Sequence, residues 1–401
     1  MDVNILDTIN TRELGKRLQE ARQKRGLTQE DAAKILDVAR TTITAIEKGE
    51  RRLKASELIR LARAYGRQVS DFVRQRPAIE SLQVQFRGPA SLSQEDREAI
   101  APQIGVFEEY CRDYLELENI AGSQQLRKYP AEYSIEGLSV EQAAEAIALE
   151  ERNRLALGDG PIPILRDILE QDVGVRIFYL SLPSQFSAMY FYSDQLGGCI
   201  AINRNHPEGR RRWSLAHDYL HFLAHRDTSS VFVEGEYQRV PESERIADAF
   251  ARYFLMPTSG LTRRFNDLRR TKPTVTFADL CTLAYYYGVS VAALTLRLEE
   301  MRLLPLGLWG KLRESGLKVR DAQNELGLEA IPAQAEPLPV RYQYLALDAF
   351  DQELITEAQF AHFLHVDRLK ARRIAEILRQ HASDVTDTTN IELSMAQLLN
   401  S

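Results

Sequence analysis

The hydrophobic pattern of the first 75 residues predicts a bundle of short helices. In "RELGKRLQEARQKRG", Leu14, Leu18 and Ala21 recur at helical spacing, and Gly26 ends the run. Thr28 is a candidate N-cap for the next helix, "TQEDAAKIL", because its hydroxyl can accept a hydrogen bond from a free N–H group at a helix start. "RTTITAIEKGE" and "KASELIRLARAYG" predict two further helices after short turns. We therefore assign residues 1–76 to a compact helical domain.

The pattern changes between residues 77 and 138. Two prolines interrupt the stretch "RPAIESLQVQFRGPASLSQ". "QEDREAIAPQIGVFEEYCRDYLELEN" then predicts a long helix with charge on one face, as is typical of a connector. We expect residues 77–138 to form a linker and a connector helix.

Residues 139–300 mix helical and strand patterns, which predicts an α+β domain that is mostly helical. "SVEQAAEAIALEERNRLAL" is a strong helix, and "VRIFYLSL", "FSAMYFYSD" and "GCIAINRN" are short, β-rich runs that predict a small sheet. "RRRWSLAHDYLHFLAHR" and "SERIADAFARYFLM" return to helical spacing, and Pro257 ends the second of them.

The remainder of the chain is predicted to be helical. Residues 301–340 are expected to form a helical extension that ends in the linker "EAIPAQAEPLPV". Residues 341–401 are expected to form a C-terminal helical module of three helices with a loosely held tail. Its basic side chains leave two interpretations open, a docking or dimer module and a second DNA-contacting element.

Charge separates the first domain from the rest of the 401 residues. Residues 1–76 contain 17 Lys and Arg and 11 Asp and Glu, a charge of +6, so the whole-chain charge of −6 leaves −12 for the remainder. A basic module on an acidic body indicates that the first domain is the part that meets a polyanion. Three widely spaced cysteines favour a reducing cytoplasm, and the apolar runs are too short to cross a membrane.

The stretch "LTQEDAAKILDVARTTITAIEKGERR" closely resembles the Cro/CI-like, Xre-type helix-turn-helix family over residues 12–75. In such a motif the second helix lies in the major groove of operator DNA. The residues expected to reach base edges from that helix are Arg40, Thr41 and Thr44. The residues expected to hold phosphates are Thr28, Gln29, Lys48 and Arg51. The resemblance also implies a homodimer. The alternative is a helical bundle used only for protein contact.

The motif "AHDYLH" predicts a metal site. His217 and His221 lie four residues apart on one helix face, so both imidazoles can reach one zinc ion. A carboxylate from a later helix is the usual third ligand, and "ESERIADAF" offers Glu244. Asp248 lies one turn further on the same face, where it can orient a ligand histidine by accepting its second N–H. The alternative is an amphipathic core helix with incidental histidines.

Residues 139–300 closely resemble the ImmA/IrrE metallopeptidase family in the order and spacing of the third strand and the two histidine- and carboxylate-bearing helices. The resemblance implies a gluzincin-like domain with Zn²⁺ bound by His217, His221 and Glu244. Asp218 stands where the family has Glu, the general base. Aspartate is one methylene shorter, and a base must reach within about 2.6–3.2 Å of the proton that it takes, so loss of most activity is expected. The family usually has Asn at the position of Asp248.

Three further residues are secondary candidates for this site. His225 continues the face of His217 and His221 and is either an alternative ligand or a structural residue. Tyr237 and Tyr253 are either stabilisers of an oxyanion or packing residues.

We therefore expect a cytoplasmic transcriptional regulator in which a DNA-binding domain and a metallopeptidase-like zinc domain share one chain. In the first hypothesis, Asp218 is the base and proteolysis of the chain itself or of a partner repressor relieves repression. In the second, the zinc site is structural or senses a ligand, and the regulator is not an enzyme. In the third, the protein is an antitoxin-like autorepressor that binds a toxin protein through its acidic body.

Overall fold

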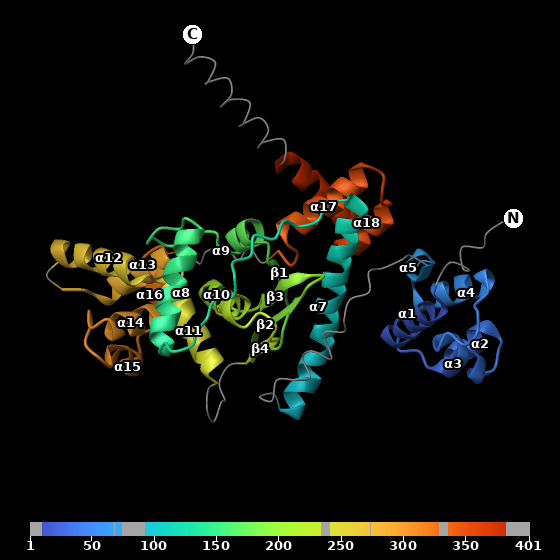
Figure 1. Cartoon of the computed structure of the whole chain (residues 1–401), viewed down its shortest axis with the longest axis horizontal. Coiled ribbons are helices and arrows are strands. Elements are labelled where there is room, and N and C mark those ends of the chain that lie inside the picture. The colour runs from blue at the N-terminus through green and yellow to red at the C-terminus, as the bar shows by residue number, and fades with distance from the viewer. Residues whose placement is uncertain are drawn as a thin grey trace, which may run out of the picture. The chain divides into compact units, whose positions relative to one another are not determined.

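The computed structural model describes residues 10–67, 69–73, 93–233, 241–272, 274–328 and 336–381 (Figure 1). The chain divides into two compact units, Met1–Ala78 and Ile79–Ser401. Both units are dominated by helices, and the second contains a small mixed sheet, which confirms the predicted fold class. The four boundaries between the five segments expected from the sequence remain predictions.

The first unit is a bundle of short helices around one apolar core. Its helices are α1 (Thr11–Lys24), α2 (Gln29–Leu36), α3 (Arg40–Glu47), α4 (Ala55–Tyr65) and α5 (Ser70–Val73). Leu14, Leu18 and Ala21 are buried as predicted, and α3 contributes Ile43 and Ile46 to the same core. Thr28 caps α2 in a capping box with Asp31. The turn before α3 needs a left-handed residue, which Asp37 supplies with φ 60°.

The second unit is built around a four-stranded sheet in the order β1-β3-β2-β4. Its strands are β1 (Arg176–Leu180), β2 (Phe186–Ser193), β3 (Gly197–Asn203) and β4 (Ser230–Val233). β1 pairs with β3 in parallel, and the other two pairs are antiparallel. The first three strands lie where the sequence predicts them. The fourth was missed because four residues are too few for a recognisable alternation.

Helices cover both faces of this sheet, so side chains of both parities along each strand are buried. One face packs on α10 and carries Ile177, Tyr179, Ala188, Tyr190, Ile200 and Ile202. The other packs on α7 and carries Phe178, Leu180, Met189, Phe191, Cys199 and Ala201. Figure 1 shows α7 and α10 on opposite sides of the strands.

The α10 side of the sheet is the larger helical layer. Its elements are α8 (Val140–Arg154), α9 (Leu165–Ile168), the π-helix Leu169–Val173, α10 (Glu208–Ala224), α11 (Glu242–Leu255), α12 (Thr258–Thr271), α13 (Phe277–Tyr287), α14 (Val291–Glu300), α15 (Leu308–Glu314) and α16 (Val319–Glu325). No single described helix is long and apolar enough to cross a membrane; α13 and α14 pass that test only as a pair, with a bend of 102° between them.

The α7 side of the sheet unites two segments that are far apart in the sequence. α7 (Gln94–Ala121) packs with α17 (Val340–Asp351), α18 (Glu357–Phe363) and a final helix over residues 368–381. Glu118, on the charged face of α7, is 3% exposed and pairs with Arg176 and Arg341. The expected connector helix therefore forms part of the core of the second unit, because its apolar residues pack there and Glu118 is paired with two arginines.

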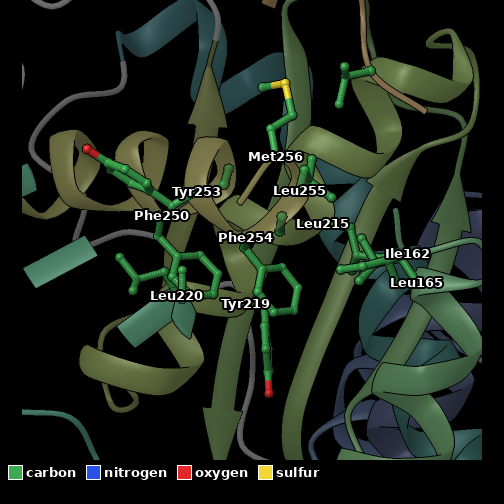
Figure 2. Packing of buried hydrophobic residues seen from close by; sticks show 14 of the residues in the cluster. Ile162, Leu165, Leu215, Tyr219, Leu220, Phe250, Tyr253, Phe254, Leu255 and Met256 are labelled. Carbon is green, nitrogen blue, oxygen red and sulfur yellow. The ribbon is translucent and has the colours of Figure 1, made fainter. Parts of the chain in front are cut away.

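A cluster of large apolar side chains fixes α10 against α11. Tyr219 and Leu220 of α10 lie beside Phe250 and Phe254 of α11 (Figure 2). The rings of Phe250 and Phe254 stack at 5.0 Å. On the side toward α8, the Tyr219 hydroxyl donates to the fully buried carboxylate of Glu151 at 2.5 Å. Apolar packing holds α10 against α11, and the buried hydrogen bond joins α10 to α8, so α10 is held in a defined register.

Candidate functional site

The metal-ligand candidates lie where α10 and α11 face each other. His217 and His221 come from α10, and Glu244 comes from the first turn of α11. Nε2 of His217 lies 3.3 Å from Nε2 of His221 and 3.1 Å from Oε2 of Glu244. Nε2 of His221 lies 3.4 Å from Oε1 of Glu244. Ligand atoms on a tetrahedral zinc ion, each about 2.0–2.1 Å from the metal, are separated by about 3.3 Å, so these three side chains fit one ion.

The hydrogen-bond chemistry of these side chains also requires a cation. Nδ1 of His217 lies 2.9 Å from Oδ1 of Asp248, and an ionised carboxylate can only accept, so the ring donates its Nδ1 hydrogen. In the neutral ring, the lone pair of Nε2 then faces the carboxylate of Glu244. Two acceptors in contact repel unless a proton or a metal ion lies between them. The donor set therefore suits zinc. Asp248 accepts the second N–H of His217, as the sequence suggests.

The protonation of the cluster follows the same electrostatics. Burial by itself lowers the pKa of His217, but hydrogen bonds to Asp248 and Glu244, with their negative charges, raise it to about 10. Burial would raise the pKa of Glu244, yet the hydrogen bonds with both histidines lower it well below its usual range. Burial lowers the pKa of His221, whose partner histidine is already positive. The cluster thus attracts one positive charge between its ligand atoms.

Asp218 lies beside this cluster in an unusual environment. It is fully buried, and neither carboxylate oxygen has a hydrogen-bond partner among the described residues. Its ligand atom lies within 4.8 Å of those of His217 and His221. Burial raises the pKa of Asp218 to about 8, against the opposing effect of the charge on His217. A buried carboxylate without a partner is costly, and it is satisfied where a water or substrate group can donate to it.

The secondary candidates are placed differently. His225 ends α10, and its ring centre lies 5.7 Å from that of His221. In the described part of the chain, His217, Asp218 and His221 have ligand atoms within 4.8 Å of one another. Neither His225 nor Glu244 belongs to this group, but the oxygens of Glu244 lie 3.1 and 3.4 Å from Nε2 of His217 and of His221. The hydroxyl of Tyr253 donates to Glu141 at 3.0 Å, which gives it a structural partner. Tyr237 lies outside the described residues.

The predicted DNA contacts fall into two groups in the first unit. Arg40, Thr41 and Lys48 are exposed on or beside α3, and their side chains form no hydrogen bond with any described residue. Thr28 is exposed, but its hydroxyl is engaged with Asp31. Thr44 donates to Gln29 and to the carbonyl of Arg40. The first group is therefore available to a ligand without losing a hydrogen bond within the protein.

A buried polar network connects α3 with α1 and α2, and it was not predicted from the sequence. Arg22 of α1 contacts Glu47 of α3 through two hydrogen bonds of 2.6 and 3.1 Å, and both side chains are nearly inaccessible. Gln29 donates to the same carboxylate at 2.9 Å. Arg51 forms a two-fold hydrogen bond with Glu57 instead of remaining free. Gln29 and Arg51 thus have structural partners that compete with the phosphate contacts expected for them.

Comparison with known proteins agrees with this division of the chain. A family model described as a helix-turn-helix matches residues 18–72. A peptidase family model described as an IrrE N-terminal-like domain matches residues 170–299, which include β1 to α14. The chain carries a helix-turn-helix domain and an IrrE N-terminal-like domain. The combination fits a DNA-binding regulator.

Two solved structures align with this chain over most of their length, at low sequence identity and with low TM-scores. ComR from Streptococcus suis is 12% identical, with coverage of 94% of this chain and 91% of that chain and a TM-score of 0.16. PlcR from Bacillus thuringiensis, solved in complex with the peptide PapR7 and DNA, is 11% identical, with coverage of 94% and 98% and a TM-score of 0.17. No curated protein matches this chain significantly.

Two further residues of the second unit, Phe232 and Glu151, support the metal-ligand candidates, and no sequence motif reveals them. The ring of Phe232, in β4, stacks on His217 with ring centres 4.2 Å apart. Glu151 accepts hydrogen bonds from Tyr219, Tyr133 and Arg154 and so anchors α10 between its two histidines. A single Glu in an amphipathic helix carries no sequence signal of such a role, because two of its partners, Tyr133 and Tyr219, come from other segments.

Proposed function

We propose that this chain is an operator-binding transcriptional regulator whose IrrE N-terminal-like domain binds zinc and modulates repression by proteolysis of the chain itself or of a partner repressor. One observation carries the proposal. The ligand atoms of His217, His221 and Glu244 lie 3.1–3.4 Å from one another, in a chain that also has a helix-turn-helix domain. Zinc held there would polarise a scissile carbonyl and lower the pKa of water.

Each residue of the chain then has a defined task. His217 and His221 offer Nε2, and Glu244 offers its carboxylate. Asp248 keeps the hydrogen of His217 on Nδ1, so that Nε2 presents its lone pair to the metal. Asp218 places a carboxylate without a hydrogen-bond partner among the described residues beside the ligand atoms, where it could take a proton from a bound water.

A second candidate function is a regulator with a zinc site but no peptidase activity. It is favoured by Asp218, whose side chain is one methylene shorter than the Glu expected of a general base. A carboxylate oxygen of Asp218 lies within 4.8 Å of the ligand nitrogens of both histidines. Neither oxygen of this carboxylate forms a hydrogen bond with a described residue. In this alternative the site is structural or senses a ligand, and DNA binding changes through conformation alone.

A cleavage assay on the zinc-loaded full chain separates the two functions. The substrates are the protein itself and any neighbouring repressor, with and without operator DNA, and the matched variants are Asp218→Glu and His217→Ala. Cutting by the unchanged sequence that is lost in His217→Ala supports the peptidase with Asp218 as base. Cutting by Asp218→Glu alone supports the second function. Absence of cutting in all three contradicts the proteolytic proposal.

The proposed DNA contact uses the exposed side of α3. Arg40 can bind guanine through two hydrogen bonds, and Thr41 can contact a thymine methyl group. Lys48 is an exposed cation beside these residues and suits a phosphate. We expect a homodimer on a palindromic operator, because two recognition helices then read two half-sites. Sedimentation of the chain with and without a palindromic duplex tests this stoichiometry.

A further inference from the structure

A polar cavity lies at the C-terminal end of α7 and shares no lining residue with the metal-ligand candidates. It is bordered by the end of α7, the segment 124–127, the start of β1 and the turn between β2 and β3. Its volume is about 520 Å³. Small-molecule sites are typically clefts of about 300–1,000 Å³, so the cavity has the size of a binding site.

Buried polar groups with unmet hydrogen bonds line this cavity. Arg176 is 1% exposed; its two terminal nitrogens donate to Glu118 and to the carbonyl of Leu196, but its Nε has no partner. Gln125 donates to the carbonyl of Glu170 at 3.1 Å, whereas its buried Oε1 accepts nothing. Such groups are rare in folded proteins because each costs free energy. Both atoms have almost no accessible surface, so they mark a polar wall of the cavity.

The charges of the lining favour a neutral ligand. The negative charges of Glu118 and Asp194 equal the positive charges of Arg127 and Arg176 in number. Glu118 is further engaged by Arg341 at 2.9 Å, and the guanidinium of Arg127 donates to the carbonyls of Asp194 and Gln195. An anion would meet two carboxylates and a cation two guanidinium groups, so neither sign of charge is matched.

The remaining lining residues favour a ligand that carries hydroxyl groups. Asn119, Gln124 and Gln195 present carboxamides, which both donate and accept hydrogen bonds, as a hydroxyl does. Leu115 and Leu126 supply apolar surface for the C–H groups of a ligand. No aromatic residue lines the cavity, so a nucleobase would find no ring on which to stack.

We propose that this cavity binds a neutral, hydroxyl-rich small molecule of the sugar or polyol class. The carboxamides of Asn119, Gln124 and Gln195 meet its hydroxyls, and the two leucines cover its carbon skeleton. The bound molecule would join the end of α7 to the segment 124–127 and to the β2–β3 turn. The proposal is independent of zinc binding and of proteolysis, since none of the metal-ligand candidates lines the cavity.

Saturation-transfer NMR and calorimetry on the full chain test the assignment with named probes. The hydroxyl-rich probes are glucose, trehalose, N-acetylglucosamine and myo-inositol, and the comparison probes are citrate, spermidine and a capped alanine dipeptide. Gln125→Leu removes the free buried acceptor, and Asn119→Ala removes an exposed carboxamide of the rim. Gln352→Leu is the matched control, because Gln352 is exposed at the end of α17 and does not line the cavity.

We expect at least one hydroxyl-rich probe to bind the unchanged chain and Gln352→Leu with equal affinity. Gln125→Leu and Asn119→Ala should each weaken it by roughly 3- to 10-fold, the effect of one lost hydrogen bond. If Gln125→Leu does not fold, Asn119→Ala decides alone. The proposal is overturned if none of the four probes binds, if both cavity variants bind as the control does, or if a comparison probe binds in their place.

Discussion

His217 on α10 donates its Nδ1 hydrogen to Asp248 on α11 across 2.9 Å, although the two residues are 31 positions apart in the sequence. The imidazole is fully buried, whereas the side chain of Asp248 is 48% exposed. The contact fixes the direction of the ring and, in the neutral imidazole, its tautomer, so that Nε2 is directed toward Glu244.

Asp248→Ala should weaken zinc binding by about 10- to 100-fold, the usual effect of losing the hydrogen-bond partner of a ligand histidine. Asp248→Asn should bind zinc with nearly the affinity of the unchanged chain, because the amide oxygen can still accept the hydrogen of Nδ1 of His217. Competition with a chromogenic zinc chelator measures both constants. Equal affinity in the alanine variant would show that Asp248 does not orient His217.

Removal of a ligand should abolish zinc binding, whereas removal of the neighbouring histidine should not. Glu244→Ala combined with Asp218→Ala leaves two nitrogens without a neighbouring carboxylate, too few for a tight site, so the purified protein should fall from about one zinc per chain to nearly none. His225→Ala is the matched control and should keep its metal, because His225 lies one turn beyond the ligand atoms. Metal analysis of both variants reports the stoichiometry. Loss of zinc from His225→Ala would make His225 a ligand.

Arg40→Ala and Lys48→Ala should affect DNA binding in different ways. Arg40→Ala should cost about 1–3 kcal/mol and reduce discrimination at one base pair, since a guanine contact is sequence-specific. Lys48→Ala should weaken binding to all duplexes similarly. The slope of log affinity against log salt concentration should fall by about 1, the effect of one lost phosphate contact. Titrations at several salt concentrations, with operator and scrambled duplexes, distinguish the two effects. Identical losses on both duplexes for Arg40→Ala would exclude a base contact.

Glu47→Ala should destabilise the helix-turn-helix domain by about 3–5 kcal/mol, because it leaves the buried guanidinium of Arg22 without its ionic partner. A double change, Arg22→Met with Glu47→Leu, should be much less harmful, since no unpaired charge remains. Hydrogen exchange of α1 to α3 in the full chain, measured by mass spectrometry, compares the two variants. Equal destabilisation would mean that packing, not charge, dominates at this position.

Much of the local structure was encoded in short stretches of sequence. Leu14, Leu18 and Ala21 predicted the buried side of α1, and Thr28 predicted the start of α2. The spacing of His217 and His221 placed both rings on one face of α10. These features depend on residues within a few positions of one another, where backbone geometry alone fixes which side chains lie together.

The tertiary structure decided which of these faces meet. Periodicity shows that a helix buries one side, but not what covers it. Only the packing of α10 on α11 brings Glu244 and Asp248 to His217. Likewise, Arg22 and Glu47 pair across 25 positions, and α7 joins the C-terminal helices on one face of the sheet. Such contacts arise from complementary shape and charge between distant segments, which no local pattern records.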